Sequence, residues 1–172
     1  MKKILLGLLV LIVLGVAVFF APGILAGDQH NETVVQVNKS REDVWKKFAD
    51  ENGMKEWLMG FKKIETVSGA PMTVGSKFRI TFDREGDEIH MMQTMTAIEE
   101  GKRFAFTLEN EVMKSDIEVT LQDKGLVTDV RQAETYHGGN IFWHSLFYWL
   151  KSTFEANSKE TLERFKKYAE GA

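Results

Sequence analysis

The sequence predicts an α+β protein in which an antiparallel sheet packs against one long C-terminal helix, behind an apolar N-terminal helix. Three observations predict this arrangement. Residues 4–20 are an unbroken run of apolar residues and glycine. Residues 61–137 contain runs of alternating apolar and polar residues separated by short turns, which is typical of neighbouring antiparallel strands. Residues 140–170 carry apolar residues three or four apart, with one gap at Asn157 and Ser158, which indicates a helix with an apolar face.

Length and charge limit the classes of protein that fit. With 172 residues the chain has room for one domain of common size. Its formal charge is -3, and without Lys2 and Lys3 it has 20 basic against 25 acidic residues. Nucleic-acid binding needs a concentrated basic face, so we exclude nucleic acid as a partner. The absence of cysteine excludes disulfides, thiolate metal sites and a cysteine nucleophile.

The N-terminal segment, residues 1–27, is predicted to be a transmembrane anchor. At about 1.5 Å per residue, its apolar part is long enough to cross a hydrocarbon core of about 30 Å. Lys2 and Lys3 precede the apolar run, so the positive-inside rule keeps the N-terminus cytoplasmic and the domain extracytoplasmic. The alternative is a signal peptide cleaved near Pro22 and Gly23, which predicts a secreted domain.

The remainder, residues 33–170, is expected to form one domain. A β-branched run at 33–38 predicts a strand, after which Ser40 caps a helix that reaches Asp50. A second short helix is expected at 54–59. The strands that follow are expected at residues 64–67, 76–84, 88–99, 103–108, 112–122 and 126–137. The helix at 140–170 must then cover the apolar face of the sheet, because no other element is long enough.

Three short segments carry a resemblance to a known superfamily. They are residues 37–45 (VNKSREDVW), 54–58 (MKEWL) and 74–78 (VGSKF). Together with the order of elements, they make the domain similar to the START-like (SRPBCC) superfamily, which includes polyketide-cyclase-like and Bet v 1-like proteins. The resemblance implies a helix-grip fold, a curved antiparallel sheet wrapped around the long C-terminal helix. It also implies a cavity between them that holds a hydrophobic or amphipathic small molecule.

The implied cavity is expected to be lined by inward-facing apolar side chains. The candidates are Trp57, Phe78, Ile80, Phe82, Met92, Phe106, Ile117, Val119, Trp143, Phe147 and Leu150. Candidates for contacts with a polar head group are Arg131, Glu134, Tyr136 and His137 on the last strand and Gln93 and Thr94 on a middle strand. Most apolar positions of this kind pack in a core without touching a ligand.

The sequence contains no pattern typical of catalysis, a metal site or a cofactor. His30, His90, His137 and His144 do not have the spacing of metal ligands. A phosphate-binding loop, a dinucleotide-binding fingerprint and a nucleophile elbow are also missing. We therefore expect no catalytic residue, no metal and no cofactor.

Residues 141–150 are apolar around almost the whole helix, whereas a helix over a sheet needs only one apolar stripe. Some of these rings therefore need a second partner. The cavity mouth, another subunit and the membrane are the options, since Trp and Tyr favour the membrane interface. Deep burial under the first two helices of the domain is the alternative.

The function predicted from these observations is that of a membrane-tethered domain that binds a lipid or other hydrophobic small molecule. One alternative is an enzyme of the polyketide cyclase or dehydratase kind, in which a few polar groups steer a reactive ligand. Another is a protein-interaction module whose cavity is filled by side chains. The volume of the cavity separates this last alternative from the other two.

Overall fold

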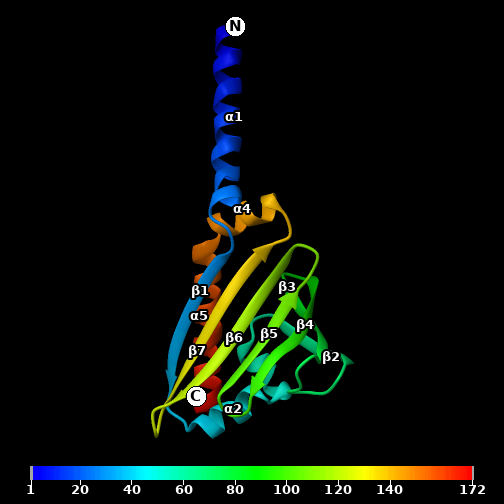
Figure 1. Cartoon of the computed structure of the whole chain (residues 1–172), viewed down its shortest axis with the longest axis vertical. Coiled ribbons are helices and arrows are strands. Elements are labelled where there is room, and N and C mark those ends of the chain that lie inside the picture. The colour runs from blue at the N-terminus through cyan, green and yellow to red at the C-terminus, as the bar shows by residue number, and fades with distance from the viewer. Residues whose placement is uncertain (1, 172) are drawn as a thin grey trace.

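The computed structural model describes residues 2–171 and shows an antiparallel sheet, a long helix on its inner face and an apolar helix extending from one end (Figure 1). The helices are α1 (Lys2–Leu25), α2 (Arg41–Phe48), the 3-10 turn η1 (Glu51–Gly53), α3 (Met54–Trp57), α4 (Ile141–Trp149) and α5 (Lys151–Glu170). The strands are β1 (Gln29–Val37), β2 (Phe61–Ser68), β3 (Lys77–Arg84), β4 (Asp87–Glu99), β5 (Arg103–Glu109), β6 (Met113–Asp123) and β7 (Thr128–Gly138).

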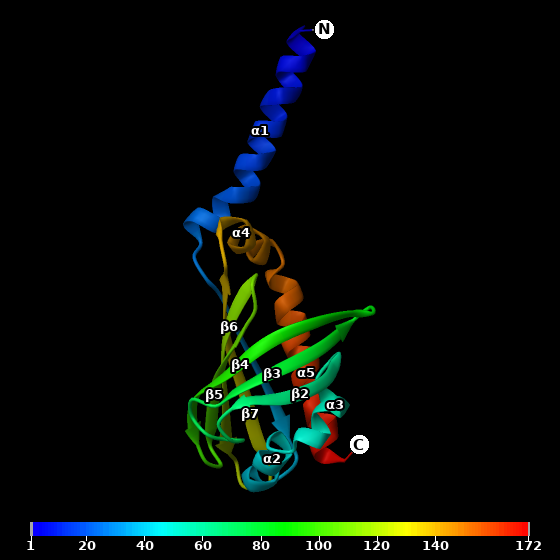
Figure 2. The ribbon, with the colours of Figure 1, turned by 90° about the vertical axis from the view of Figure 1, so that its right-hand side faces the viewer.

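The seven strands form one sheet in the order β1-β7-β6-β5-β4-β3-β2, with every neighbouring pair antiparallel. The predicted meander is confirmed, because β2 to β7 pair in the order of the chain. A register shift between Met95 and Ala97 interrupts the pairing of β4 with β5, and such bulges bend a strand. The sheet curves around α5 (Figure 2), which confirms the helix-grip fold.

Helix α5 packs against the inner face of the sheet through one apolar face. Leu162, Phe165 and Ala169 are buried on it at helical spacing. The ring of Phe165 stacks on Phe48 of α2, with 3.7 Å between ring centroids. α2 is held in place by its predicted cap, since the Ser40 side chain accepts a hydrogen bond from the backbone N–H of Asp43. The core therefore brings together α2, near the start of the domain's sequence, and α5, at its end.

The prediction of one continuous helix over 140–170 is wrong in one respect. Asn140 does cap the helix, accepting from the backbone N–H groups of Phe142 and Trp143. The helix then breaks at Leu150, whose φ of -94° and ψ of 7° are not helical. α5 follows the sheet, whereas α4 lies across its end, beside α1 and opposite α2 and α3 (Figures 1 and 2). The alternative of burial under the first two helices is therefore wrong.

Helix α1 is long and apolar enough to cross a membrane, and none of its residues is buried. Only its last turns contact the domain, and they contact α4. The ring of Phe142 lies 5.8 Å from that of Phe19, measured between centroids, and the indole N–H of Trp149 donates to the Phe19 carbonyl oxygen. A Cβ atom at Gly23 would lie 2.2 Å from the Ser145 Oγ, so the two helices are in close contact there.

Candidate functional site

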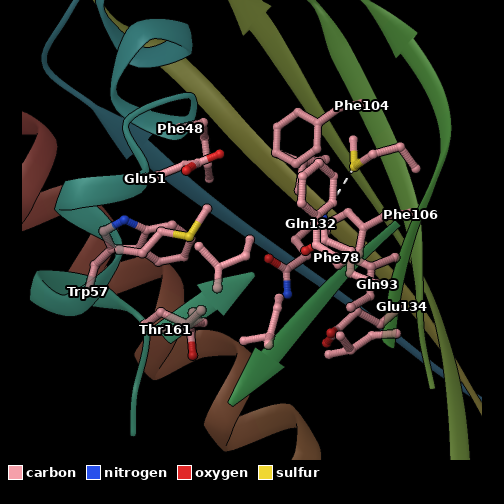
Figure 3. A pocket seen from close by; sticks show the side chains of 18 of the residues that line it. Phe48, Glu51, Trp57, Phe78, Gln93, Phe104, Phe106, Gln132, Glu134 and Thr161 are labelled. Atoms are coloured by element: carbon pink, nitrogen blue, oxygen red, sulfur yellow. Dashed lines mark hydrogen bonds between the residues drawn. The ribbon is translucent and has the colours of Figure 1, made fainter. Parts of the chain in front are cut away.

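A cavity of about 270 Å³ lies between the inner face of the sheet, α3, α5 and the loop from β2 to β3. This volume is close to the lower end of the range found for ligand pockets. Its walls are formed by Phe48, Ala49, Glu51, Met54, Trp57, Leu58, Ile64, Pro71, Met72, Phe78, Ile80, Phe82, Gln93, Met95, Phe104, Phe106, Leu108, Ile117, Val119, Gln132, Glu134, Tyr136, Asn157, Ser158 and Thr161. In Figure 3, Trp57 lies across the cavity from Phe104 and Phe106.

The larger part of the cavity wall is apolar and aromatic. Phe104 and Phe106 stack on β5 with 6.2 Å between ring centroids. Trp57 packs edge-on against Phe48 and Phe165, at 5.8 and 5.2 Å. Aromatic contacts of this kind hold rings in defined positions, so the apolar wall is supported by the core behind it.

The remaining part of the wall is polar and is built largely by β7 and α5, with Gln93 of β4 and Glu51 of η1. Alternate residues of β7 point inward, which places Gln132, Glu134 and Tyr136 in the wall. The Tyr136 hydroxyl donates to Glu134 Oε2 at 2.6 Å, and the Ser158 hydroxyl donates to the same oxygen. Burial, followed by the charge of Glu134, raises the pKa of Tyr136 well above its ordinary value. The phenol therefore keeps its proton and remains a donor.

Seven of the eleven predicted apolar positions line the cavity. They are Trp57, Phe78, Ile80, Phe82, Phe106, Ile117 and Val119. That they contact a ligand stays a prediction. Met92 does not line the cavity, because it pairs with Arg79 on the outer face of the sheet, whereas Met91 pairs with Ile80. Trp143, Phe147 and Leu150 also lie elsewhere, because α4 packs beside α1 and away from the cavity.

The polar candidates divide between the two faces of the sheet. Tyr136, Glu134 and Gln93 line the cavity. Thr94, Arg131 and His137 do not, because they occupy outward positions of their strands. There the Arg131 guanidinium donates to Glu32.

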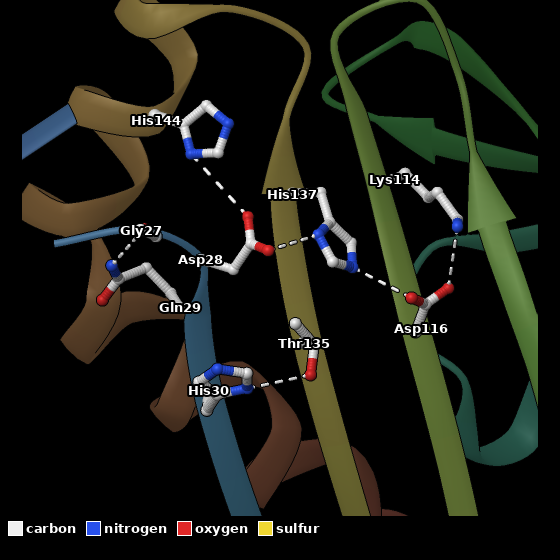
Figure 4. A network of polar contacts seen from close by, with 9 residues as sticks. All are labelled: Gly27, Asp28, Gln29, His30, Lys114, Asp116, Thr135, His137 and His144. Atoms are coloured by element: carbon white, nitrogen blue, oxygen red, sulfur yellow. Dashed lines mark hydrogen bonds and ion pairs between the residues drawn. The ribbon is translucent and has the colours of Figure 1, made fainter. Parts of the chain in front are cut away.

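His137 belongs to a separate polar network at the end of the sheet near α4. Its Nδ1 lies 2.8 Å from Asp28, and its Nε2 lies 2.9 Å from Asp116 (Figure 4). His144 of α4 approaches Asp28 at 3.8 Å. Among residues 2–171, no group of three or more histidine and carboxylate side chains is arranged to hold a metal ion. The ion pairs connect Asp28, which directly precedes β1, with β6, β7 and α4.

Several cavity residues were missed by the sequence analysis. Phe104 and Leu108 follow from Phe106 by strand alternation. Ser158 follows from Leu162 at a spacing of four, and Thr161 follows from Ser158 at a spacing of three. Pro71 and Met72, in the loop between β2 and β3, have no such periodic signal. Loop residues of this kind can be assigned to the cavity only once the fold is known.

A curved sheet and a long helix that enclose a mainly apolar cavity define a helix-grip ligand-binding domain. In agreement with this, a family described as polyketide cyclase / dehydrase and lipid transport matches residues 28–170. The chain belongs to this family, which lies within the predicted SRPBCC superfamily. No curated protein sequence matches the chain.

Solved structures share the fold at low sequence identity. Ara h 8.0201 is 14% identical, with a TM-score of 0.68 over 85% of this chain and 100% of its own. The Zhui aromatase/cyclase from Streptomyces sp. R1128 is 16% identical, with a TM-score of 0.68 over 83% of this chain and 94% of its own. A conserved protein from Geobacillus kaustophilus is 11% identical, with a TM-score of 0.68 over 82% and 95%. Identities this low establish the fold alone.

Proposed function

We propose that the protein is a membrane-tethered binding protein that holds a lipid or other hydrophobic small molecule in its cavity. The cavity itself, about 270 Å³ of space under aromatic rings, is the observation that carries this proposal. Cores normally have few voids larger than one water molecule, which occupies about 30 Å³ in the liquid. A space of this size supports ligand binding better than an interaction module filled by its own side chains.

The membrane tether is the second part of the proposal. α1 has 24 residues, which at 1.5 Å per residue is about 36 Å, against a hydrocarbon core of about 30 Å. With Lys2 and Lys3 at the cytoplasmic head groups, the opposite interface falls near residues 19–23. This is the segment that packs against α4, whose Tyr148 and Trp149 are partly exposed and suit the interfacial region. The domain then lies against the outer leaflet.

Ligand binding can be tested by filling the cavity. We would purify the full chain from its own host in native nanodiscs and extract the bound hydrophobic compounds for mass spectrometry. Leu108→Trp replaces an aliphatic side chain of the cavity wall with a bulky indole ring. Val34→Trp places the same ring on the outer face of β1, where Val34 is 52% exposed. We expect one compound in stoichiometric amount with the wild type and with Val34→Trp, and its loss from Leu108→Trp. The same compounds from all three proteins would contradict the proposal.

The tether can be tested with single cysteines, since the chain has none of its own. Lys124 lies in an exposed turn between β6 and β7. We expect Lys124→Cys to react with a membrane-impermeant maleimide on intact cells, and Lys3→Cys to react only after lysis. A shortened, soluble product would indicate a cleaved signal peptide, and labelling of Lys3→Cys on intact cells would reverse the topology.

A second candidate function is catalysis of the cyclase or dehydratase kind. The buried carboxylate of Glu134 favours it, because general acid–base catalysis needs such a group beside the ligand. The extracted compound distinguishes the two functions. A binding protein returns it unchanged after prolonged incubation, whereas an enzyme converts it.

A further inference from the structure

The residues around the cavity have an uneven distribution of charge. Of the described residues that line it, Glu51 and Glu134 are acidic and none is a lysine, arginine or histidine. The basic groups of β7, Arg131 and His137, lie on the opposite face of the sheet beside acidic partners. A ligand in the cavity is therefore close to negative charge and is separated by the sheet from the basic groups of β7.

Glu134 is the deeper of the two acids. It is 8% exposed, whereas Glu51 is exposed at the rim. Both hydroxyl groups that bind Glu134, from Tyr136 and Ser158, donate to Oε2. Within residues 2–171 neither hydroxyl donates to the second oxygen, Oε1, so Oε1 can accept a hydrogen bond from a donor on the ligand. A buried carboxylate strongly disfavours a second anion nearby because the local dielectric constant is low, whereas an O–H or N–H donor gains a charge-assisted hydrogen bond.

We infer that the cavity selects hydrophobic ligands whose polar end is a neutral or cationic hydrogen-bond donor, such as an alcohol, phenol or amine. Anionic amphiphiles such as fatty acids are rejected. The inference rests on the proposed function, because it assigns the chemical class of the ligand for the same cavity. The donor end of the ligand lies at Glu134, and its apolar body lies against the aromatic wall that includes Phe104 and Phe106.

Three probes that share one ring system test the inference. They are 2-naphthylmethanol, 2-naphthylmethylammonium and 2-naphthoate, titrated calorimetrically into the full chain in phosphatidylcholine nanodiscs. Titration of empty nanodiscs corrects for partitioning into lipid. We expect the alcohol and the ammonium compound to bind at least about tenfold more tightly than naphthoate, as hydrogen bonds to charged groups predict.

A pair of matched variants assigns this preference to Glu134. Glu134→Gln keeps the shape of the side chain and removes its charge, so the preference for the ammonium compound over naphthoate falls to about threefold or less. Glu118→Gln is the control. It removes the same charge from the outer face of the sheet, where Glu118 pairs with Arg103 at 2.6 Å, and it keeps the wild-type order of affinities.

The possible outcomes separate the inference from the proposed function. If the wild type binds the three probes equally, or binds naphthoate most tightly, the inference is wrong. The proposed function is not contradicted by that result, because the cavity still binds a ligand. A Glu134→Gln protein that binds the probes with the wild-type preference also overturns it. Failure of all three probes to bind would contradict the proposed function, and the inference with it.

Discussion

Helices α4 and α5 follow one another directly in the chain, yet they pack against different partners. α5 buries one stripe, including Leu162 and Phe165, against the sheet and the helices α2 and α3, and exposes a charged face. α4 has apolar residues on nearly every side, and its Phe142 and Trp149 remain 44% and 50% exposed even beside α1. A helix with one apolar stripe, such as α5, can bury that stripe against the rest of the domain alone. A helix that is apolar all round needs a second partner, and here the last turns of α1 provide part of it.

The largest expected effect is the loss of unfolding free energy when a core ring of α5 is removed, compared with the loss when a ring of α4 is removed. Phe165 is fully buried, and Phe165→Ala is expected to lower the free energy of unfolding by about 3–5 kcal/mol, as for other large-to-small core changes. Phe142→Ala removes a half-exposed ring at the end of the domain and should cost about 1 kcal/mol or less. Urea unfolding of the full chain in detergent micelles, followed by tryptophan fluorescence, measures both. Similar losses from the two variants would mean that α4 is part of the same core.

The period of the apolar residues explains why much of the fold could be predicted from the sequence. In β3, Phe78, Ile80 and Phe82 alternate with polar residues, so the inward face is fixed without knowledge of the partner strands. In β4, two methionines stand side by side, and alternation alone cannot decide which points inward. The pairing with β3 decides it, by placing Met91 opposite Ile80. The error at Met92 is therefore an error of register.

The break between α4 and α5 could not be predicted for a different reason. The residues around Leu150 include no glycine or proline that would mark the end of a helix. The change of direction accompanies the packing of α4 against α1, a contact between residues more than one hundred positions apart. The polar wall of the cavity depends in the same way on the approach of Ser158 to Glu134. Contacts of this kind belong to the folded chain and leave no local pattern.

The contact between α1 and α4 can be tested with two glycines of the same helix. A side chain at Gly23 would meet Ser145 Oγ and the Ile141 carbonyl, whereas a Cβ at Gly15 would have nothing within 4 Å. Overpacking costs about 1–3 kcal/mol, so Gly23→Val should speed hydrogen exchange of the α4 amides about fivefold to hundredfold. Gly15→Val should leave it unchanged, and α5 should be unchanged in both. Equal protection of α4 in the two variants would mean that α4 packs independently of α1.

The smallest expected effect concerns the tyrosines of the two helices. The Tyr168 hydroxyl of α5 donates to Asp50 at 2.7 Å and ties the end of the helix to η1. Tyr168→Phe keeps the ring, including its contact with the Lys47 ammonium at 4.5 Å, and should lower Tm by about 2–4 °C. Tyr148→Phe of α4 changes a 40% exposed ring and should leave Tm within about 1 °C. Thermal unfolding in the same micelles measures both Tm values. A larger fall in Tm from Tyr148→Phe than from Tyr168→Phe would contradict the conclusion that α5 is more firmly held in the domain than α4.

The pH dependence of that difference identifies the bond responsible. The hydrogen bond from Tyr168 holds the pKa of Asp50 below its ordinary value, so its contribution is complete above about pH 4 and is lost as the pH falls through the lowered value. Burial, with Asp50 next, raises the pKa of Tyr168 to about 12, so the same bond is complete below about pH 10 and is lost as the pH rises through about 12. The Tm gap between wild type and Tyr168→Phe should therefore be constant from about pH 5 to 9 and shrink at both ends. A gap that does not shrink on acidification would show that the hydrogen bond to the Asp50 carboxylate is not its source.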